Sequence, residues 1–252
     1  MKHTLLSCAV AIAALCAGSA NARGFTGCDV DSDYDLRIGE DALTFTRETG
    51  SPQRVVMRAG TLAVDGVAQD LTAADAARIS TYERDIRAMV PEVKAIAVQA
   101  VGIAIDAVVQ VATAFAGNNA DATRLARIDA LGDALVERID ASVDTADWRD
   151  AQFDAAIAEV TAELVPMIVG DIAAVAVTAA LSGDEDTLAQ VEARAASLER
   201  EVETRVEKRA GDIERRADRL CPRVQALDEI ESALELRLAD GSRLDLVRLE
   251  DE

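Results

Sequence analysis

Histidine is almost absent from this chain. The one histidine, His3, lies in an N-terminal segment that we expect to be cleaved, so the mature protein is expected to contain no imidazole. Without histidine there is no Ser-His or Cys-His dyad, no histidine metal ligand, and no side chain whose ordinary pKa lies near neutrality. The sequence therefore predicts a protein that is not an enzyme, and the residual alternative is a carboxylate-based hydrolase.

Other catalytic and binding motifs are missing too. The mature lysines are Lys94 and Lys208, and neither has a serine three residues earlier, so there is no Ser-x-x-Lys nucleophile. Glycine-rich phosphate loops and cysteine pairs at metal-ligand spacing are absent, and we predict no cofactor. Aromatic residues make up only 3% of the chain, which disfavours base stacking or a sugar platform and leaves Ala, Val, Leu and Ile to build the core.

Basic residues are also scarce. Lys and Arg total 26 against 46 Asp and Glu, a formal net charge of −20. Proteins that bind nucleic acid carry stripes of Lys and Arg, whereas here the basic residues are interleaved with more numerous acids. Nucleic acid is therefore not expected as a partner.

The N-terminus has the pattern of a signal peptide. Lys2 precedes an apolar run from Leu5 to Leu15, and Ala20-Asn21-Ala22 places small residues at the positions that signal peptidase recognises. We predict a signal peptide over 1–22, cleaved after Ala22. The apolar run is shorter than the ~20 residues of a membrane span, which disfavours a retained anchor, and lipidation at Cys8 would leave too short an apolar stretch before the cysteine.

Two cysteines remain in the mature chain, Cys28 and Cys221. In an oxidising compartment such an isolated pair favours a disulfide over two free thiols. Closing a loop of roughly 190 residues would stabilise the fold by about 5 kcal/mol in the chain-entropy model. We therefore expect the two ends of the mature chain to be neighbours in space.

Residues 29–67 have the pattern of β-strands. Between 29 and 38, apolar or small residues alternate with charged ones, and two shorter strands follow at 43–45 and 55–57. Asp65-Gly66 supplies the positive φ angles of a tight hairpin turn between 61–64 and 67. At the other end of the chain, 234–249 alternates around a second turn at Asp240-Gly241, and we expect this hairpin to join the first strands in one sheet.

The residues between are predicted to be helical. One helix begins after Thr72 and is ended or restarted by Pro91, and others cover 92–116, 120–142 and 148–181, the last kinked at Pro166. A fifth helix over about 185–220 has apolar residues at heptad spacing, typical of a coiled coil, so it needs a long partner from the same chain or from another copy. Pro222 should start a short helix.

These patterns predict an α+β fold that is mostly helical. Long antiparallel helical hairpins or a coiled coil accompany a small antiparallel sheet built from N- and C-terminal strands. We expect 23–252 to form one domain, with N-terminal strands over 23–70, a helical region over 71–233 and a C-terminal hairpin over 234–252.

A row of acidic residues is the sharpest candidate site. The spacing of an EF-hand calcium loop fits five of them, but its glycine position is occupied by Tyr34 and its flanks are predicted strands. The favoured interpretation is an acidic, solvent-facing side of an edge strand, which discourages aggregation. We predict no metal site, and weak divalent-cation binding remains the alternative for Asp29, Asp31, Asp33, Asp35 and Glu40.

Two acids lie in the most apolar helical segments. If Asp106 and Asp171 both faced the interior, they would share a proton as carboxylate dyads do; the alternative is that each lies at the edge of its apolar face, paired with an arginine or reaching water. The segments around them, 95–116 and 164–182, are either buried core helices or surfaces that contact lipid or a membrane.

One block of the sequence resembles a known family. Gly60–Gly66, Leu71-Thr72, Tyr82, Ile86-Arg87 and 90–97 are similar to the DUF2884 (YggN-like) family of exported gammaproteobacterial proteins, whose members also carry one early and one late cysteine. The resemblance covers essentially the whole mature chain. It implies a periplasmic location, and it implies no activity, cofactor or catalytic residue.

A function class follows from the long charged helix and the missing catalytic residues. We expect a non-enzymatic scaffold or chaperone-like protein whose helical surfaces bind another envelope protein or a second copy of the chain. The alternative is a lipid- or membrane-associated envelope protein that uses 95–116 and 164–182.

Overall fold

The computed structural model describes residues 29–116, 122–145, 147 and 185–250, together with isolated helical positions between 155 and 177. The predicted signal peptide, Cys28, Asp171 and most of the predicted helix over 148–181 lie outside the described residues. Within them the protein is mostly helical with small antiparallel sheets, so the predicted α+β class is confirmed.

The larger sheet is a five-stranded antiparallel meander. Its order is β2 (Asp35–Ile38), β3 (Leu43–Thr46), β4 (Arg54–Arg58), β5 (Thr61–Val64) and β6 (Val67–Ala68), so each strand pairs with the next in sequence. The predicted hairpin at Asp65-Gly66 is confirmed: the two residues have φ values of 48° and 83° and connect β5 to β6. Residues 143–145 cover the free edge of β2, where the N–H of Ile38 donates to the carbonyl of Val143 at 2.8 Å.

The two ends of the described chain pair with each other. β1 (Asp29–Asp31) and β7 (Arg248–Glu250) form a separate two-stranded antiparallel sheet, with Val30 opposite Leu249. The alternating run over 29–38 is therefore not one strand, because it breaks at 32–34 between β1 and β2. Ser32 explains the break: its hydroxyl accepts the N–H of Tyr34 at 3.1 Å and donates to the carbonyl of Leu246 at 2.7 Å.

Four described helices follow the predicted order with one difference. They are α2 (Ala73–Ala116), α3 (Ala122–Ala141), α5 (Glu185–Asp218) and α6 (Cys221–Ser232). The prediction that Pro91 ends or restarts a helix is wrong, since α2 runs through it as one helix of 44 residues. Pro91 lies on the exposed side of α2, where water can satisfy the carbonyl that proline leaves without a partner.

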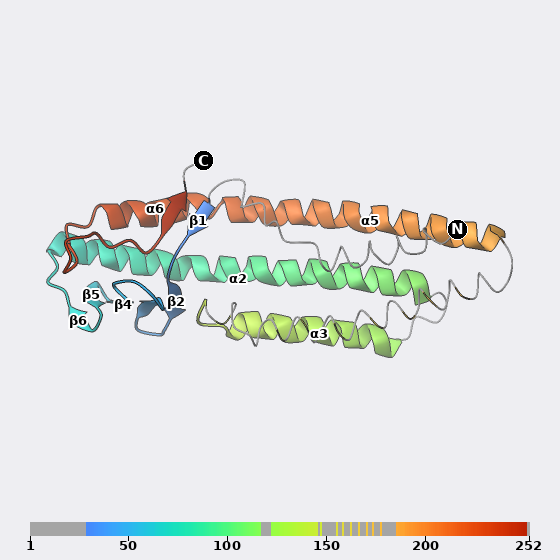
Figure 1. Cartoon of the computed structure of the whole chain (residues 1–252), viewed down its shortest axis with the longest axis horizontal. Helices are drawn as coiled ribbons and strands as arrows, with labels where there is room; N and C mark the ends of the chain where they lie inside the picture. The colour runs from blue at the N-terminus through green and yellow to red at the C-terminus, as the bar shows by residue number, and fades with distance from the viewer. Residues whose placement is uncertain are drawn as a thin grey trace.

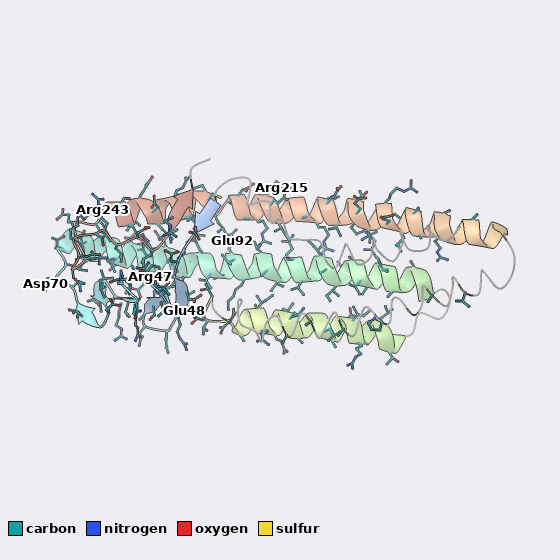
Figure 2. The ribbon with its side chains drawn as sticks, in the orientation of Figure 1. Arg47, Glu48, Asp70, Glu92, Arg215 and Arg243 are labelled. Atoms are coloured by element: carbon teal, nitrogen blue, oxygen red, sulfur yellow. The ribbon has the colours of Figure 1, made fainter. Side chains whose placement is uncertain are left out.

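The long helices form an elongated bundle that extends from the sheets. α2 lies between α5 and α3, and the first turns of α5 continue beyond the end of α2 (Figure 1). We call α3, α5 and the part of α2 from Glu92 to Ala116 the helical arm. Glu92 lies where the arm leaves the sheets (Figure 2).

The main core lies at the sheet end of the molecule. Inward side chains of the meander pack against Ile79, Tyr82 and Ile86 of α2, and the rings of Phe45 and Tyr82 meet edge to face with centroids 6.2 Å apart. The arm has a much smaller buried cluster around Ala112 and Ile128. Most of the buried hydrophobic side chains of the described chain therefore lie at the sheet end.

The predicted C-terminal hairpin is only partly correct. The turn at Asp240-Gly241 forms, with the N–H of Leu238 donating to the carbonyl of Ser242 at 2.9 Å, but residues 234–247 contain no strand. Leu234, Leu238, Leu244 and Leu246 are buried in the core. The backbone over 234–247 does not pair as a strand. Carboxylates of α2 and α6 instead accept the N–H groups of residues 235, 236, 246 and 247.

Candidate functional site

The heptad seam of α5 faces α2. Val202, Val206 and Ala210 are half-buried along it, and Ala217 is buried. The coiled-coil partner that the sequence requires is therefore supplied within the chain, by the apolar part of α2.

Polar contacts flank this seam at regular intervals. Glu92 pairs with Arg223 of α6 at 3.6 Å, Gln99 accepts a hydrogen bond of 2.7 Å from Arg216, and Asp106 pairs with Arg209. The partners advance by seven residues along α2 and retreat by seven along the C-terminal helices, as an antiparallel coiled coil requires. The seven-residue spacing is visible in the sequence, but only the register of α2 against α5 and α6 shows which residues pair.

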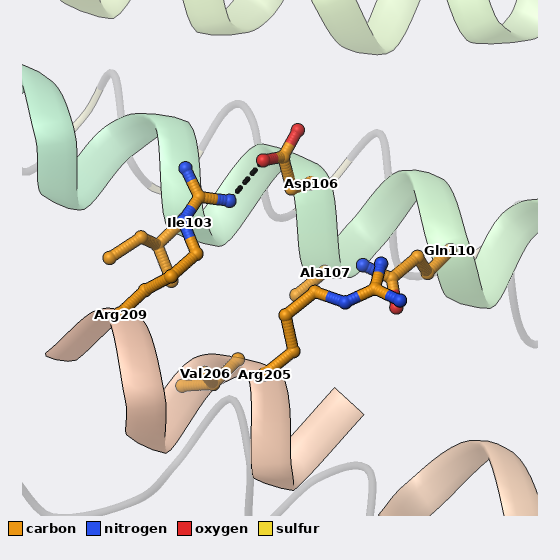
Figure 3. Close-up of a pocket in the computed structure, with 7 residues that line it drawn as sticks. All are labelled: Ile103, Asp106, Ala107, Gln110, Arg205, Val206 and Arg209. Atoms are coloured by element: carbon orange, nitrogen blue, oxygen red, sulfur yellow. Dashed lines mark hydrogen bonds and ion pairs between the residues drawn. The ribbon is translucent and has the colours of Figure 1, made fainter. Parts of the chain in front are cut away.

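Asp106 lies at a shallow groove between α2 and α5 (Figure 3). Its side chain is 57% exposed, so its candidacy as a buried acid is wrong. The other interpretation, an acid at the edge of its apolar face paired with an arginine, describes it correctly. Its proposed partner Asp171 lies outside the described residues. The groove is lined by Ile103, Asp106, Ala107, Gln110, Arg205, Val206 and Arg209.

Two acids of the row near the N-terminus, Asp31 and Asp33, form ion pairs with arginine. Arg248 of β7 donates to Asp31 at 2.6 Å and to Asp33 at 2.9 and 3.0 Å, and Arg47 approaches Asp33 at 3.7 Å. The hydrogen bond from Arg248, with its positive charge, lowers the pKa of Asp33.

The other members of the row are not gathered around the same point. Asp35 accepts a hydrogen bond of 3.4 Å from the hydroxyl of Thr145, and Glu40 is exposed in the loop before β3. Nothing is described of the Asp29 side chain. In the part of the chain that the structure describes, no three His, Cys, Asp or Glu residues are placed to hold a metal ion.

Sequence reasoning missed a buried carboxylate, Glu231, near the end of α6. It is 3% exposed, and the hydroxyl of Tyr82 donates to its Oε1 at 2.5 Å. Its Oε2 accepts the backbone N–H of Leu246 at 2.7 Å and of Val247 at 3.4 Å. Burial raises the pKa of Glu231 to about 7, although these hydrogen bonds act in the opposite direction. Burial and the adjacent Glu231 raise the pKa of Tyr82 as well.

A second missed carboxylate, Asp75, lies in the first turn of α2. It is 1% exposed and accepts the backbone N–H groups of Glu235 and Leu236 at 3.1 to 3.2 Å. Arg78 donates to it at 2.8 Å, and its own N–H donates to the hydroxyl of Thr72 at 3.1 Å. Together Asp75 and Glu231 bind the backbone of residues 234–247 on both sides of the turn at Asp240-Gly241. Nothing in the local sequence separates these two acids from the exposed ones.

Comparison with known proteins shows the family of this chain. The family model described as "Protein of unknown function (DUF2884)" matches residues 28–247. The chain belongs to the DUF2884 family. The resemblance seen in the sequence is confirmed, and the match includes both Cys28 and Cys221. No curated protein and no solved structure matches this DUF2884 chain.

One described helix of this DUF2884 protein is long and apolar enough to cross a membrane, judged by length and composition only. It covers Ala73–Ala114, and 11% of its most apolar window is buried inside the molecule. Asp106 lies within this segment and pairs with Arg209 of α5. The second apolar segment, 164–182, lies outside the described residues apart from isolated positions.

Proposed function

We propose that the protein is a non-enzymatic interaction protein of the periplasm, a scaffold or chaperone-like protein that binds another envelope protein or a second copy of itself through its helical arm. The observation that carries this proposal is the outer face of α5. While the seam of α5 packs on α2, its other side is exposed and carries closely mixed charges of both signs. Arg215 lies on this outer side (Figure 2).

The shape of the described chain supports the same proposal. The arm buries few side chains, so it adds little to the core while displaying a large helical surface. The groove between α2 and α5 is shallow, and its acid is paired with an arginine. A long, polar, well-exposed helix is the kind of element that recognises a partner by charge complementarity.

Site-specific photocrosslinking in the periplasm tests the proposal. A photoreactive residue at Glu203 or Glu207, both exposed on α5, should form a covalent adduct of one defined mass, whereas the same residue at Thr61 on the sheet should not. Charge reversal at Lys208 should weaken the adduct. Equal labelling from the sheet and arm positions, or no adduct from the arm, would contradict the proposal.

The low burial of α2 favours a second candidate, a lipid- or membrane-associated envelope protein that uses 95–116 and 164–182. Ala100 and Ala104 are exposed on the apolar part of α2. If this surface binds lipid, the protein should float with neutral vesicles, and Ala104→Glu should abolish flotation while leaving the fold intact. Lack of flotation in the native protein would eliminate this candidate.

The predicted disulfide belongs to the same proposal. Cys221 is buried at the start of α6, and β1 begins directly after Cys28 and pairs with β7. These positions support a bridge between Cys28 and Cys221 that fastens the first strand to the end of the arm. The signal peptide and its cleavage after Ala22 remain predictions, tested by the N-terminal sequence of the mature protein.

A further inference from the structure

The C-terminal segment 244–250 is held to the molecule by a small number of directional contacts that converge on Glu231. Its backbone N–H groups at Leu246 and Val247 donate to Oε2 of Glu231, while the carbonyl of Leu246 accepts the hydroxyl of Ser32. Leu244 and Leu246 are 4% and 1% exposed. Beyond them, β7 pairs with β1 and Arg248 binds Asp31 and Asp33.

Glu231 lies where α2, α6 and this segment meet. α2 contributes the hydroxyl of Tyr82, and the segment contributes the two N–H groups. Two further acids act on the pair by their negative charge: Asp245 in the segment raises the pKa of both Glu231 and Tyr82, and Asp228 on α6 raises that of Tyr82. The two buried acids of α2 are engaged elsewhere. Asp75 binds Arg78 and the N–H groups of Glu235 and Leu236, and Glu83 binds Arg87 and the N–H of Ala59.

This environment has opposite effects on the two forms of the carboxyl group. Three donors favour the anion, but burial and the neighbouring acids disfavour it, and no basic side chain donates to Glu231 among the described contacts. When the segment leaves, water reaches the carboxyl group, and burial no longer destabilises its ionised form. Docking and proton binding at Glu231 are therefore coupled.

We propose that the proton on Glu231 controls the docking of segment 244–250, so that the segment is held when Glu231 is protonated and loosens when it ionises. Loosening would free Arg248 from Asp31 and Asp33 and expose the leucines of the segment. The device would thus change the surface around β1 and β7, without unfolding the meander or the arm.

Amide hydrogen exchange in the full mature chain tests this coupling. Protection factors, corrected for the intrinsic pH dependence of exchange, should fall about tenfold at Leu246 and Val247 between pH 6 and pH 8. Amides of β3 and β4 should keep their protection over the same range. In Glu231→Gln, which stays neutral, the pH dependence at 246 and 247 should vanish; in Glu229→Gln, an exposed control on the same helix, it should persist.

A second variant keeps the test decisive if Glu231→Gln does not fold. Tyr82→Phe removes one donor to the anion, so the midpoint of the change at Leu246 and Val247 should move to higher pH. Constant protection at these amides in the native chain, an equal change throughout the core, or an unshifted midpoint in Tyr82→Phe would each overturn the proposal.

Discussion

Asp75 offers the sharpest test of how the residues that follow α6 are held to the core. The side chain is 1% exposed, and its two oxygens accept the N–H groups of Glu235 and Leu236 and a hydrogen bond from Arg78. Replacing it by asparagine keeps the volume but removes the charge and turns one acceptor into a donor. The remaining oxygen can still accept both backbone N–H groups, as one oxygen of Asp75 does now, but without a full negative charge. The new amide N–H groups take the place of the oxygen that binds Arg78, so a buried donor is left facing another donor.

The size of the effect follows from these contacts. A hydrogen bond to a charged group contributes about 1.5–3 kcal/mol, and a buried donor left without a partner costs about 1–3 kcal/mol. Arg78 is partly exposed and can turn to water, so its lost ion pair adds little. We expect Asp75→Asn to lower the free energy of unfolding by about 3 kcal/mol.

Urea denaturation followed by circular dichroism measures the change, and hydrogen exchange at Glu235 and Leu236 localises it. Asp133→Asn is the matched control, because Asp133 is exposed on α3; it should change stability by less than about 0.5 kcal/mol. If Asp75→Asn were as stable as the native chain and kept both amides protected, carboxylate capture of the C-terminal backbone would be wrong.

Three further predictions concern the same end of the molecule. Folding raises the pKa of Glu231 from its ordinary value of 4.5 to about 7, so between these two pH values the folded chain binds more protons than the unfolded chain. The stability that this proton contributes is fully present below pH 4.5 and is lost as the pH rises through 7. Relative to Glu231→Gln, the native chain should lose about 2–3 kcal/mol between pH 5 and pH 8 in urea titrations; a constant difference would contradict this. Gly60→Ala should lower stability by about 3 kcal/mol in the same assay, since Gly60 has φ of 79° and a Cβ would lie 2.9 Å from the carbonyl oxygen of Ala76; a stability equal to the native chain would refute the clash. Reduction should add two hydrogens to the mass of the mature protein and lower its melting temperature, whereas alkylation of Cys28 and Cys221 in the native, unreduced protein would refute the bridge.

The local sequence determined most of the segments that became helices and strands. The heptad seam identified α5, Pro222 marked the start of α6, and Asp65-Gly66 fixed a hairpin, because each depends on residues close together in the chain. The family was also evident from contiguous motifs. Scarce histidine and aromatic residues and the excess of acid are properties of composition alone.

Only the tertiary structure decided what the charged residues do. Asp33 is one acid of a conspicuous row, yet it binds an arginine 215 residues away; Asp75 and Glu231 look ordinary in sequence and are nearly fully buried. Pro91 breaks no helix because it lies on the exposed side of α2, and 234–247 form no strand because side-chain carboxylates take their N–H groups. Periodicity records how a residue relates to its near neighbours, whereas burial and ion pairing depend on which distant segments the fold brings into contact.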